Sequence, residues 1–278
     1  MRLVSFESDQ GRSYGRIEDG GIAPATRDFR ARFPDLRSLL AADALKDLET
    51  ETTLVAPDSV RWTSPVPNPD KILCVGLNYA AHIKETGRDR PPHPSIFTRY
   101  PSSVLGHGAP LLRPHVSDEF DYEGELAVII GRPGRYIAAA DAIDHIAGYT
   151  CFNDGTIRDY QRHTSQFWPG KSFDSTGAAG PWMVTADEMG DPAKQHLRTI
   201  LNGREVQSTP ISDLAFSIAE IIAYVSQVTR LSPGDIIATG TPGGVGRFRT
   251  PPLYMHAGDV VEVEITGIGT LRNPIAEE

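Results

Sequence analysis

Residues 120–130 read Phe-Asp-Tyr-Glu-Gly-Glu-Leu-Ala-Val-Ile-Ile, and this stretch places two glutamates at the head of an apolar run that is typical of a buried β-strand. Side chains alternate faces along a strand, so Glu123 and Glu125 point the same way. Like charges side by side repel, and an ordinary explanation for such a pair is a solvated strand face. The apolar residues 126–130 argue against that explanation, because they indicate a strand without a solvated face.

A bound divalent cation resolves the repulsion between these carboxylates. Asp154, which follows the next apolar run at residues 147–152, supplies a third oxygen ligand. An all-carboxylate site selects a hard ion, Mg²⁺ first and Mn²⁺ or Ca²⁺ next, whereas zinc prefers nitrogen and sulfur. The sequence therefore predicts a metal site formed by Glu123, Glu125 and Asp154.

Composition and charge exclude several classes of protein. The chain has 278 residues, enough for a sizeable core, and its formal net charge of −9 argues against nucleic-acid binding, which requires a basic surface. The first residues lack the pattern of a signal peptide, and no run approaches the roughly 20 apolar residues of a membrane span. We therefore expect a cytoplasmic protein without a membrane segment. Cys74 and Cys151 are expected to be buried free thiols.

Two regions are expected along the chain. Residues 1–65 are predicted to form a small N-terminal α/β domain, with paired strands at 3–6 and 13–17 and short helices at 35–40 and 45–48. Three prolines between residues 64 and 70 mark the boundary.

Residues 66–278 are predicted to form the main domain, which is rich in strands. Strands are expected at 71–75, 96–98, 122–130, 146–152, 182–185, 198–201, 235–238 and 259–265. Helical periodicity is clearest over residues 211–228. Many strands with one dominant helix favour a mainly β (α+β) fold, a mixed β-rich barrel or sandwich, over a doubly wound sheet.

Three further segments carry candidate site residues. His82 and Glu85 are three apart in a predicted short helix, where a carboxylate raises the basicity of an imidazole, although a surface pair is the commoner explanation. Lys171 lies among glycines and aromatics and can complement an enolate or carboxylate, unless it is an ordinary surface lysine. The glycine-rich turn at residues 238–246 exposes backbone N–H groups that can hold a carboxylate or phosphate.

Taken together, these segments resemble the fumarylacetoacetate hydrolase family. The resemblance runs from about residue 71 to residue 274 and includes the Asp-Tyr-Glu-Gly-Glu segment, Asn153 to Gln161, Gly170 to Asp174, and the Thr-Gly-Thr-Pro of residues 239–242. It implies a β-roll of mixed sheets, a homodimer and a Mg²⁺-dependent site.

The resemblance also implies roles for individual residues. Glu123, Glu125 and Asp154 resemble the metal ligands, and His82 with Glu85 resembles a water-activating dyad on a lid. The expected substrate contacts are Gln161, Lys171, Thr241 and Arg99. Two positions depart from the family pattern, since Arg99 stands where many relatives carry lysine and Gly124 replaces a common alanine.

These implied roles lead to a hypothesis of a Mg²⁺-dependent hydrolase that cleaves a C–C bond in a 2,4-dioxo acid of the acylpyruvate or fumarylpyruvate type, in small-molecule or aromatic catabolism. His82, supported by Glu85, would activate the water, and Lys171 would stabilise the departing enolate. Three alternatives remain. They are an oxaloacetate-like 2-oxo acid decarboxylase, a 2-hydroxyhepta-2,4-diene-1,7-dioate-type isomerase, and a non-catalytic ligand-binding protein with a structural Ca²⁺.

Overall fold

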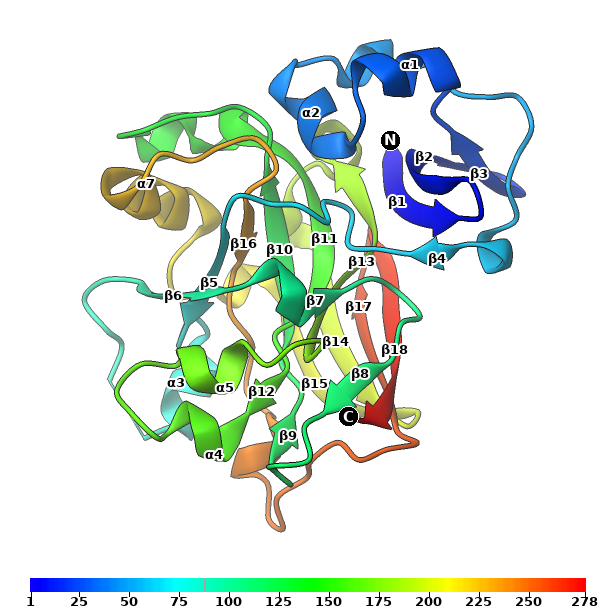
Figure 1. Cartoon of the computed structure of the whole chain (residues 1–278). Coiled ribbons are helices and arrows are strands. Elements are labelled where there is room, and N and C mark those ends of the chain that lie inside the picture. The colour runs from blue at the N-terminus through cyan, green and yellow to red at the C-terminus, as the bar shows by residue number, and fades with distance from the viewer. Residues whose placement is uncertain (88) are drawn as a thin grey trace.

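The computed structural model describes residues 1–87 and 89–278, and it contains one large sheet, a second sheet of five strands and a small two-stranded sheet (Figure 1). The strands of the large sheet are β1 (Arg2–Ser8), β2 (Gly11–Glu18), β3 (Gly21–Pro24), β4 (Arg61–Trp62), β5 (Ile72–Gly76), β6 (Ser95–Arg99), β7 (Val104–Leu105), β10 (Gly124–Ile130), β11 (Ile146–Asn153), β13 (Gly177–Thr185) and β16 (Ile236–Ala238). They follow the order β3-β2-β1-β13-β11-β10-β16-β5-β6, with β4 on β1 and β7 on β13.

The second sheet has the order β15-β14-β17-β18-β8, in which the strands are β8 (Leu111–Arg113), β14 (His196–Leu201), β15 (Arg204–Pro210), β17 (Val260–Ile265) and β18 (Gly269–Glu277). The two-stranded sheet pairs β9 (Phe120–Asp121) with β12 (Thr156–Ile157). The α-helices are α1 (Arg27–Arg32), α2 (Leu36–Ala41), α3 (Ala80–Glu85), α4 (Arg158–Gln161), α5 (Trp168–Lys171), α6 (Ala186–Met189) and α7 (Ile218–Val228). The 3₁₀ helices are η1 (Leu45–Asp47), η2 (Pro57–Ser59), η3 (Pro101–Ser103), η4 (Ala139–His145), η5 (Pro192–Lys194), η6 (Ile211–Asp213) and η7 (Gly246–Phe248). The predicted mainly β (α+β) fold is confirmed.

Strand β10 is buried on both faces, which explains its continuous apolar sequence. Leu126 and Val128 belong to the core shared with the five-stranded sheet and α7. Ala127 and Ile129 belong to a second core formed with the N-terminal helices. Gly124 lies close to β14, because a Cβ there would come within 2.0 Å of the hydroxyl oxygen of Thr199.

The N-terminal residues form the elements that the sequence predicts, and they also extend the large sheet. β1 and β2 pair antiparallel, and α2 at residues 36–41 overlaps the predicted helix at 35–40. β1 also pairs with β13, with Leu3 opposite Met183. The N-terminal strands and helices lie at the upper right of Figure 1, beside this pairing. The domain boundary at residue 65 stays a prediction.

The main helix begins later than predicted. Residues 211–213 form η6, and α7 begins at Ile218. Ser217 and Glu220 form a capping box at this start, in which each side chain accepts a hydrogen bond from the backbone N–H of the other residue. Strands β15 and β18 were not predicted. β15 is solvated on one side and lacks a long apolar run.

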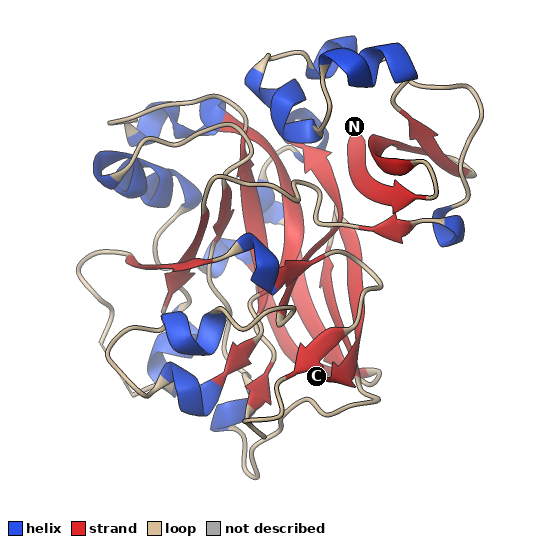
Figure 2. Ribbon diagram, viewed as in Figure 1, coloured by secondary structure: helices blue, strands red, loops and turns tan. Residues whose placement is uncertain are grey.

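Helices α3, α4 and α5 gather at one end of the large sheet, near β6, β9 and β12 (Figure 2). This end holds the residues that the sequence singles out, because β5, β11 and β16 end in loops there and β10 begins there. The loops bring the candidate site together.

Candidate metal centre and its cavity

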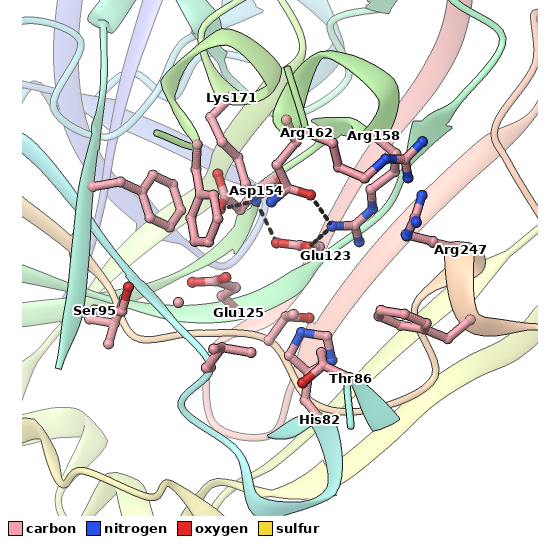
Figure 3. Close-up of a pocket in the computed structure, with 18 of the residues that line it drawn as sticks. His82, Thr86, Ser95, Glu123, Glu125, Asp154, Arg158, Arg162, Lys171 and Arg247 are labelled. Atoms are coloured by element: carbon pink, nitrogen blue, oxygen red, sulfur yellow. Dashed lines mark hydrogen bonds and ion pairs between the residues drawn. The ribbon is translucent and has the colours of Figure 1, made fainter. Parts of the chain in front are cut away.

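The three predicted carboxylates meet in space. Oxygen atoms of Glu123, Glu125 and Asp154 all lie within 4.8 Å of one another, and the three residues are buried. Glu123 directly precedes β10, Glu125 is the second residue of β10, and Asp154 directly follows β11. β10 and β11 are paired, with Glu125 opposite Phe152, so their register brings Asp154 beside the two glutamates. Figure 3 shows this group inside the cavity.

The side chains of Lys171 and Arg158 both contact Glu123, and Lys171 also contacts Asp154. Lys171 Nζ lies 2.6 Å from Glu123 Oε2 and 2.6 Å from Asp154 Oδ2. Burial alone would raise the pKa of Glu123, but Lys171, Arg158 and His82 outweigh it and lower that pKa to about 2. Burial would lower the pKa of Lys171, yet Asp154 and Glu123 raise it above its ordinary value. Lys171 is therefore a buried ammonium and not a surface lysine.

Glu125 is the uncompensated member of the triad. Within residues 1–87 and 89–278, the ion pairs formed by lysine and arginine do not include Glu125, and its Oε2 accepts a hydrogen bond of 2.8 Å from Gly240 N–H. Burial raises its pKa well above the ordinary value, and the charges of Asp154 and Glu123 raise it further. A buried carboxylate that is repelled by its neighbours fits a site for a divalent cation. A group of three carboxylates suits a hard ion.

Arg99 lies behind Asp154 and not on the cavity wall. Its guanidinium is fully buried and donates to Asp154 Oδ1 at 2.7 Å, to Gly155 O at 2.8 Å and to Thr176 Oγ1 at 2.9 Å. A Cβ at Gly177 would lie 2.8 Å from Arg99 Nη2, so the glycine leaves room for the guanidinium. The structure thus places Arg99 where it holds a carboxylate of the triad, and its role as a substrate contact stays a prediction.

Arg158 is a site residue that the sequence reasoning missed. It begins α4, bonds Asp121 at 2.8 Å and Glu123 at 2.7 Å, and donates to Gln161 at 3.1 Å. Its Nη2 is buried and has no hydrogen-bond partner among the residues that the structure describes. The available signal was its place inside the segment from Asn153 to Gln161, four residues after a candidate metal ligand.

The His–Glu pair forms as the helical spacing predicts. His82 Nδ1 lies 3.0 Å from Glu85 Oε2, and the imidazole lines the cavity while it is mostly buried. The other oxygen of Glu85 accepts a hydrogen bond of 3.0 Å from Gly244 N–H. Glu85 therefore orients the imidazole and ties α3 to the glycine-rich loop.

The glycine-rich loop binds carboxylates of its own chain. Its N–H groups donate to Glu125 from Gly240, to Glu85 from Gly244, and to Asp121 from Gly246. The sequence predicted that these N–H groups can hold a carboxylate. In the structure the carboxylates that they bind are Glu125, Glu85 and Asp121 of the same chain.

A cavity of about 740 Å³ lies above the triad. Its walls include the predicted residues His82, Glu123, Glu125, Asp154, Gln161, Lys171 and Thr241, together with Val75, Leu77, Phe97, Arg158, Arg162, Phe167, Arg247 and Phe248. Glu85 and Arg99 act from behind this wall. Phe97 and Phe167 pack edge to face with ring centroids 5.7 Å apart, and they make one side of the cavity apolar.

The fold and the site together define a class, a mainly β protein with a candidate divalent-metal centre and a fixed imidazole at the end of its large sheet. Comparison with known sequences identifies the family within this class. Residues 71–276 match the family described as Fumarylacetoacetate (FAA) hydrolase C-terminal. The chain belongs to the fumarylacetoacetate hydrolase family, which is a family of enzymes.

Three similar proteins illustrate this membership. Oxaloacetate tautomerase FAHD2A, mitochondrial, from Bos taurus is 36% identical over 287 residues, covering 99% of this chain and 91% of the relative. Oxaloacetate tautomerase YisK from Bacillus subtilis (strain 168) is 45% identical over 221 residues, covering 78% of this chain and 73% of the relative. The crystal structure of a putative HpcE protein from Mycobacterium smegmatis superposes with a TM-score of 0.90 at 34% identity, over 100% of this chain and 99% of that one. Among the helices that the structure describes, none is long and apolar enough to cross a membrane.

Proposed function

We propose that this protein is a divalent-metal-dependent enzyme that interconverts the enol and keto forms of a 2-oxo acid of the oxaloacetate type, with Mg²⁺ held by Glu123, Glu125 and Asp154. Its similarity to two oxaloacetate tautomerases supports the reaction type. The observation that carries the proposal is the placement of His82 and Lys171. They lie on opposite sides of Glu123 and Glu125 in Figure 3, so a base and a cation face the same space from two directions.

Tautomerisation transfers a proton between C3 and the oxygen on C2. Because Glu85 occupies Nδ1 of His82, the other ring nitrogen, Nε2, is the atom available to accept the C3 proton and to deliver it to the oxygen on C2, and to carry a proton from that oxygen to C3 in the opposite direction. The electron pair of the C3–H bond becomes the C2–C3 double bond, and negative charge collects on the C2 oxygen. The buried ammonium of Lys171 stabilises this charge. Glu123, Glu125 and Asp154 would hold the divalent ion, which would supply Lewis-acid chemistry to the reacting end of the acid.

Gln161 and Thr241 are proposed to contact the acid from the cavity wall. Gln207 Nε2 donates to Thr241 Oγ1 at 2.8 Å, and this hydroxyl donates to Gly124 O at 3.1 Å. These bonds fix the direction of the hydroxyl, so it presents its remaining lone pair in one orientation. For Arg99 we propose a positioning role behind Asp154 in place of a substrate contact.

The test measures enol–keto conversion directly. The enol form of oxaloacetate is added to purified protein, and the loss of enol absorbance is followed together with exchange of the C3 hydrogens in D₂O by NMR. We expect acceleration of both over buffer, abolition by EDTA and recovery with Mg²⁺ or Mn²⁺. Full activity in metal-free protein, or no acceleration by metal-loaded protein, would contradict the proposal.

Hydrolysis of an acylpyruvate is the second candidate, and the His82–Glu85 pair favours it. The same base can take a proton from water, whose oxygen then attacks the C4 carbonyl; the C3–C4 bond breaks and its electron pair leaves as a pyruvate enolate. Acetylpyruvate and fumarylpyruvate are the substrates to assay, with products identified by mass. If neither is cleaved faster than in buffer, this candidate is excluded. The homodimer and the cytoplasmic location stay predictions.

A further inference from the structure

We infer that Gln207 is a positioning residue of the metal centre. Its buried side-chain amide joins the backbone that carries Glu123 and Glu125 to the glycine-rich loop, and this connection holds the three carboxylates close enough to share one ion. The inference rests on the proposed function, which assigns a divalent ion to the triad. It adds the residue of the second sheet that keeps the triad in place.

Gln207 points into the protein because β15 contains a β-bulge. Two successive residues of β14 lie opposite Gln207 and Glu205, so Val206 between them is one extra residue on β15. Val206 and Gln207 are both buried, whereas an unbroken strand would turn one of them to the solvated face. A bulge re-aims a side chain in this way, and bulges are frequent beside functional sites.

Two backbone groups fix the direction of the Gln207 amide. Its Oε1 accepts a hydrogen bond of 3.0 Å from Gly124 N–H, which can only donate, and its Nε2 donates at 3.0 Å to Pro242 O, which can only accept. The second hydrogen on Nε2 is donated to Thr241 Oγ1 at 2.8 Å. Gln207 is 2% exposed, so loss of these bonds would leave buried polar groups unpaired.

The peptide group that Gln207 holds connects two of the proposed metal ligands. Gly124 N–H belongs to the peptide group that follows Glu123, and the carbonyl oxygen of the same peptide group accepts a hydrogen bond of 2.8 Å from Asp154 N–H. Gln207 and Asp154 therefore bind opposite sides of one planar unit, because its N–H and C=O point in opposite directions. A tilt of this peptide group would move the backbone of Glu123 relative to Asp154.

The third proposed ligand is held through the glycine-rich loop. Gly240 N–H donates to Glu125 Oε2 at 2.8 Å, and Gln207 binds the next two residues, Thr241 and Pro242. Gln207 thus fixes the loop directly beside the N–H that orients Glu125. Oxygen atoms of the three carboxylates lie within 4.8 Å of one another and repel, so loss of this anchor would let Glu125 turn away from the other two.

Arg249 makes a second connection between the same three segments. Its Nη2 donates to Val206 O on β15, and its Nε donates to Tyr122 Oη at 2.9 Å and to Gly244 O at 3.1 Å. Tyr122 Oη also donates to Gly244 O at 3.1 Å. Because these bonds remain when Gln207 is replaced, its loss should loosen the metal centre without separating the segments.

The test measures the affinity of metal-free protein for Mn²⁺ by calorimetry. Gln207→Met keeps the length of the side chain but removes its hydrogen bonds, and we expect the affinity to fall about tenfold or more, as loss of a residue that orients metal ligands does. Asn273→Leu is the matched control. Asn273 is another buried amide of the second sheet, outside the cavity, and it donates to Gly106 O at 2.9 Å and to Ala109 O at 2.8 Å. This control should be destabilised to urea to a similar extent and should keep its Mn²⁺ affinity.

Gln207→Asn is a second variant that retains the amide. Its side chain is one methylene shorter, so it can bind the strand or the loop but cannot bridge them. We expect its Mn²⁺ affinity to fall as well. Unchanged affinity in both Gln207 variants, or an equal fall in Asn273→Leu, would overturn the inference.

A second readout requires no metal. Exchange of the Gly240 amide hydrogen in D₂O, followed by NMR in the presence of EDTA, reports on the hydrogen bond to Glu125. We expect this exchange to be about tenfold faster in Gln207→Met than in Asn273→Leu, the size of one hydrogen bond to a charged group. Equal exchange in the two variants would overturn the inference.

These outcomes are separable from those of the proposed function. If the parent protein binds no Mn²⁺, the metal assignment of the proposed function fails. Faster exchange of Gly240 in Gln207→Met would then still support the positioning of Glu125 by Gln207, and equal exchange would overturn it. If Gln207→Met loses Mn²⁺ affinity while the parent protein does not accelerate tautomerisation, the positioning role stands and the proposed reaction fails.

Discussion

Arg99 Nη1 donates to Asp154 Oδ1 at 2.7 Å, and neither side chain is exposed to solvent. The other oxygen of Asp154 lies 2.6 Å from Lys171, so this carboxylate is held from both sides before any metal binds. Arg99 spans from the end of β6 to the end of β11, and it fixes the direction of a predicted metal ligand through a rigid planar guanidinium. Such outer contacts orient ligands and tune metal affinity.

Replacing Arg99 with lysine should weaken metal binding. Arg99→Lys keeps the charge but loses the donors to Gly155 and Thr176, so Asp154 is less well oriented. We expect Mn²⁺ affinity, measured by calorimetry, to fall about tenfold or more. Arg198→Lys is the matched control and should leave the affinity unchanged. Unchanged affinity in Arg99→Lys would show that Asp154 needs no such support.

Glu123 and Glu125, the two glutamates at the start of β10, should change the free energy of unfolding in opposite directions when their charge is removed. In EDTA, Glu125→Gln should raise the free energy of unfolding by about 1 kcal/mol, because burial and neighbouring carboxylates raise the pKa of Glu125 and disfavour its ionised form. Glu123→Gln should lower it by about 3 kcal/mol, because Lys171 and Arg158 lose a buried partner. Urea denaturation measures both. Each variant should also lose the stabilisation that Mn²⁺ gives the parent protein, and the same sign for both variants in EDTA would contradict this account.

His82 should be needed for proton transfer. His82→Ala should lower kcat for enol–keto conversion, and for acylpyruvate hydrolysis if it occurs, by roughly 10²-fold or more, as removal of a general base does. Decarboxylation of oxaloacetate requires no water and should survive much better. His115→Ala removes an exposed imidazole outside the cavity and serves as the control. Equal loss of all activities in His82→Ala would indicate that the imidazole closes the site or positions the substrate.

Lys171 should act on the transition state more than on substrate binding. An enolate forms only along the reaction path, so Lys171→Met should lower kcat by the equivalent of about 2–4 kcal/mol with a smaller change in KM. Removing the ammonium also leaves Glu123 and Asp154 without their shared cation, so Mn²⁺ affinity should be retained or increased. A strong rise in KM with unchanged kcat would assign Lys171 to the ground-state carboxylate.

Local patterns in the sequence predicted the parts of the site that lie on one element. The period of a strand places Glu123 and Glu125 on the same face, and the period of a helix brings His82 beside Glu85, so both pairs follow from backbone geometry alone. The main strands were predicted from apolar runs for the same reason. The sequence placed the start of α7 too early, because the apolar pattern begins in η6, before the Ser217 cap.

Only the tertiary structure decided which distant segments meet. The pairing of β1 with β13 and the contacts of Arg99 with Asp154 and of Arg158 with Asp121 join residues that are remote in sequence. The same holds for the loop N–H groups that bind Glu85, Glu125 and Asp121. Strand order, sheet register and loop path determine these contacts. The periodicity of apolar residues shows only which face of a single helix or strand is buried, so it cannot predict them. The sequence by itself therefore determined the chemistry that is present, and the packing of the sheets determined which charge faces which.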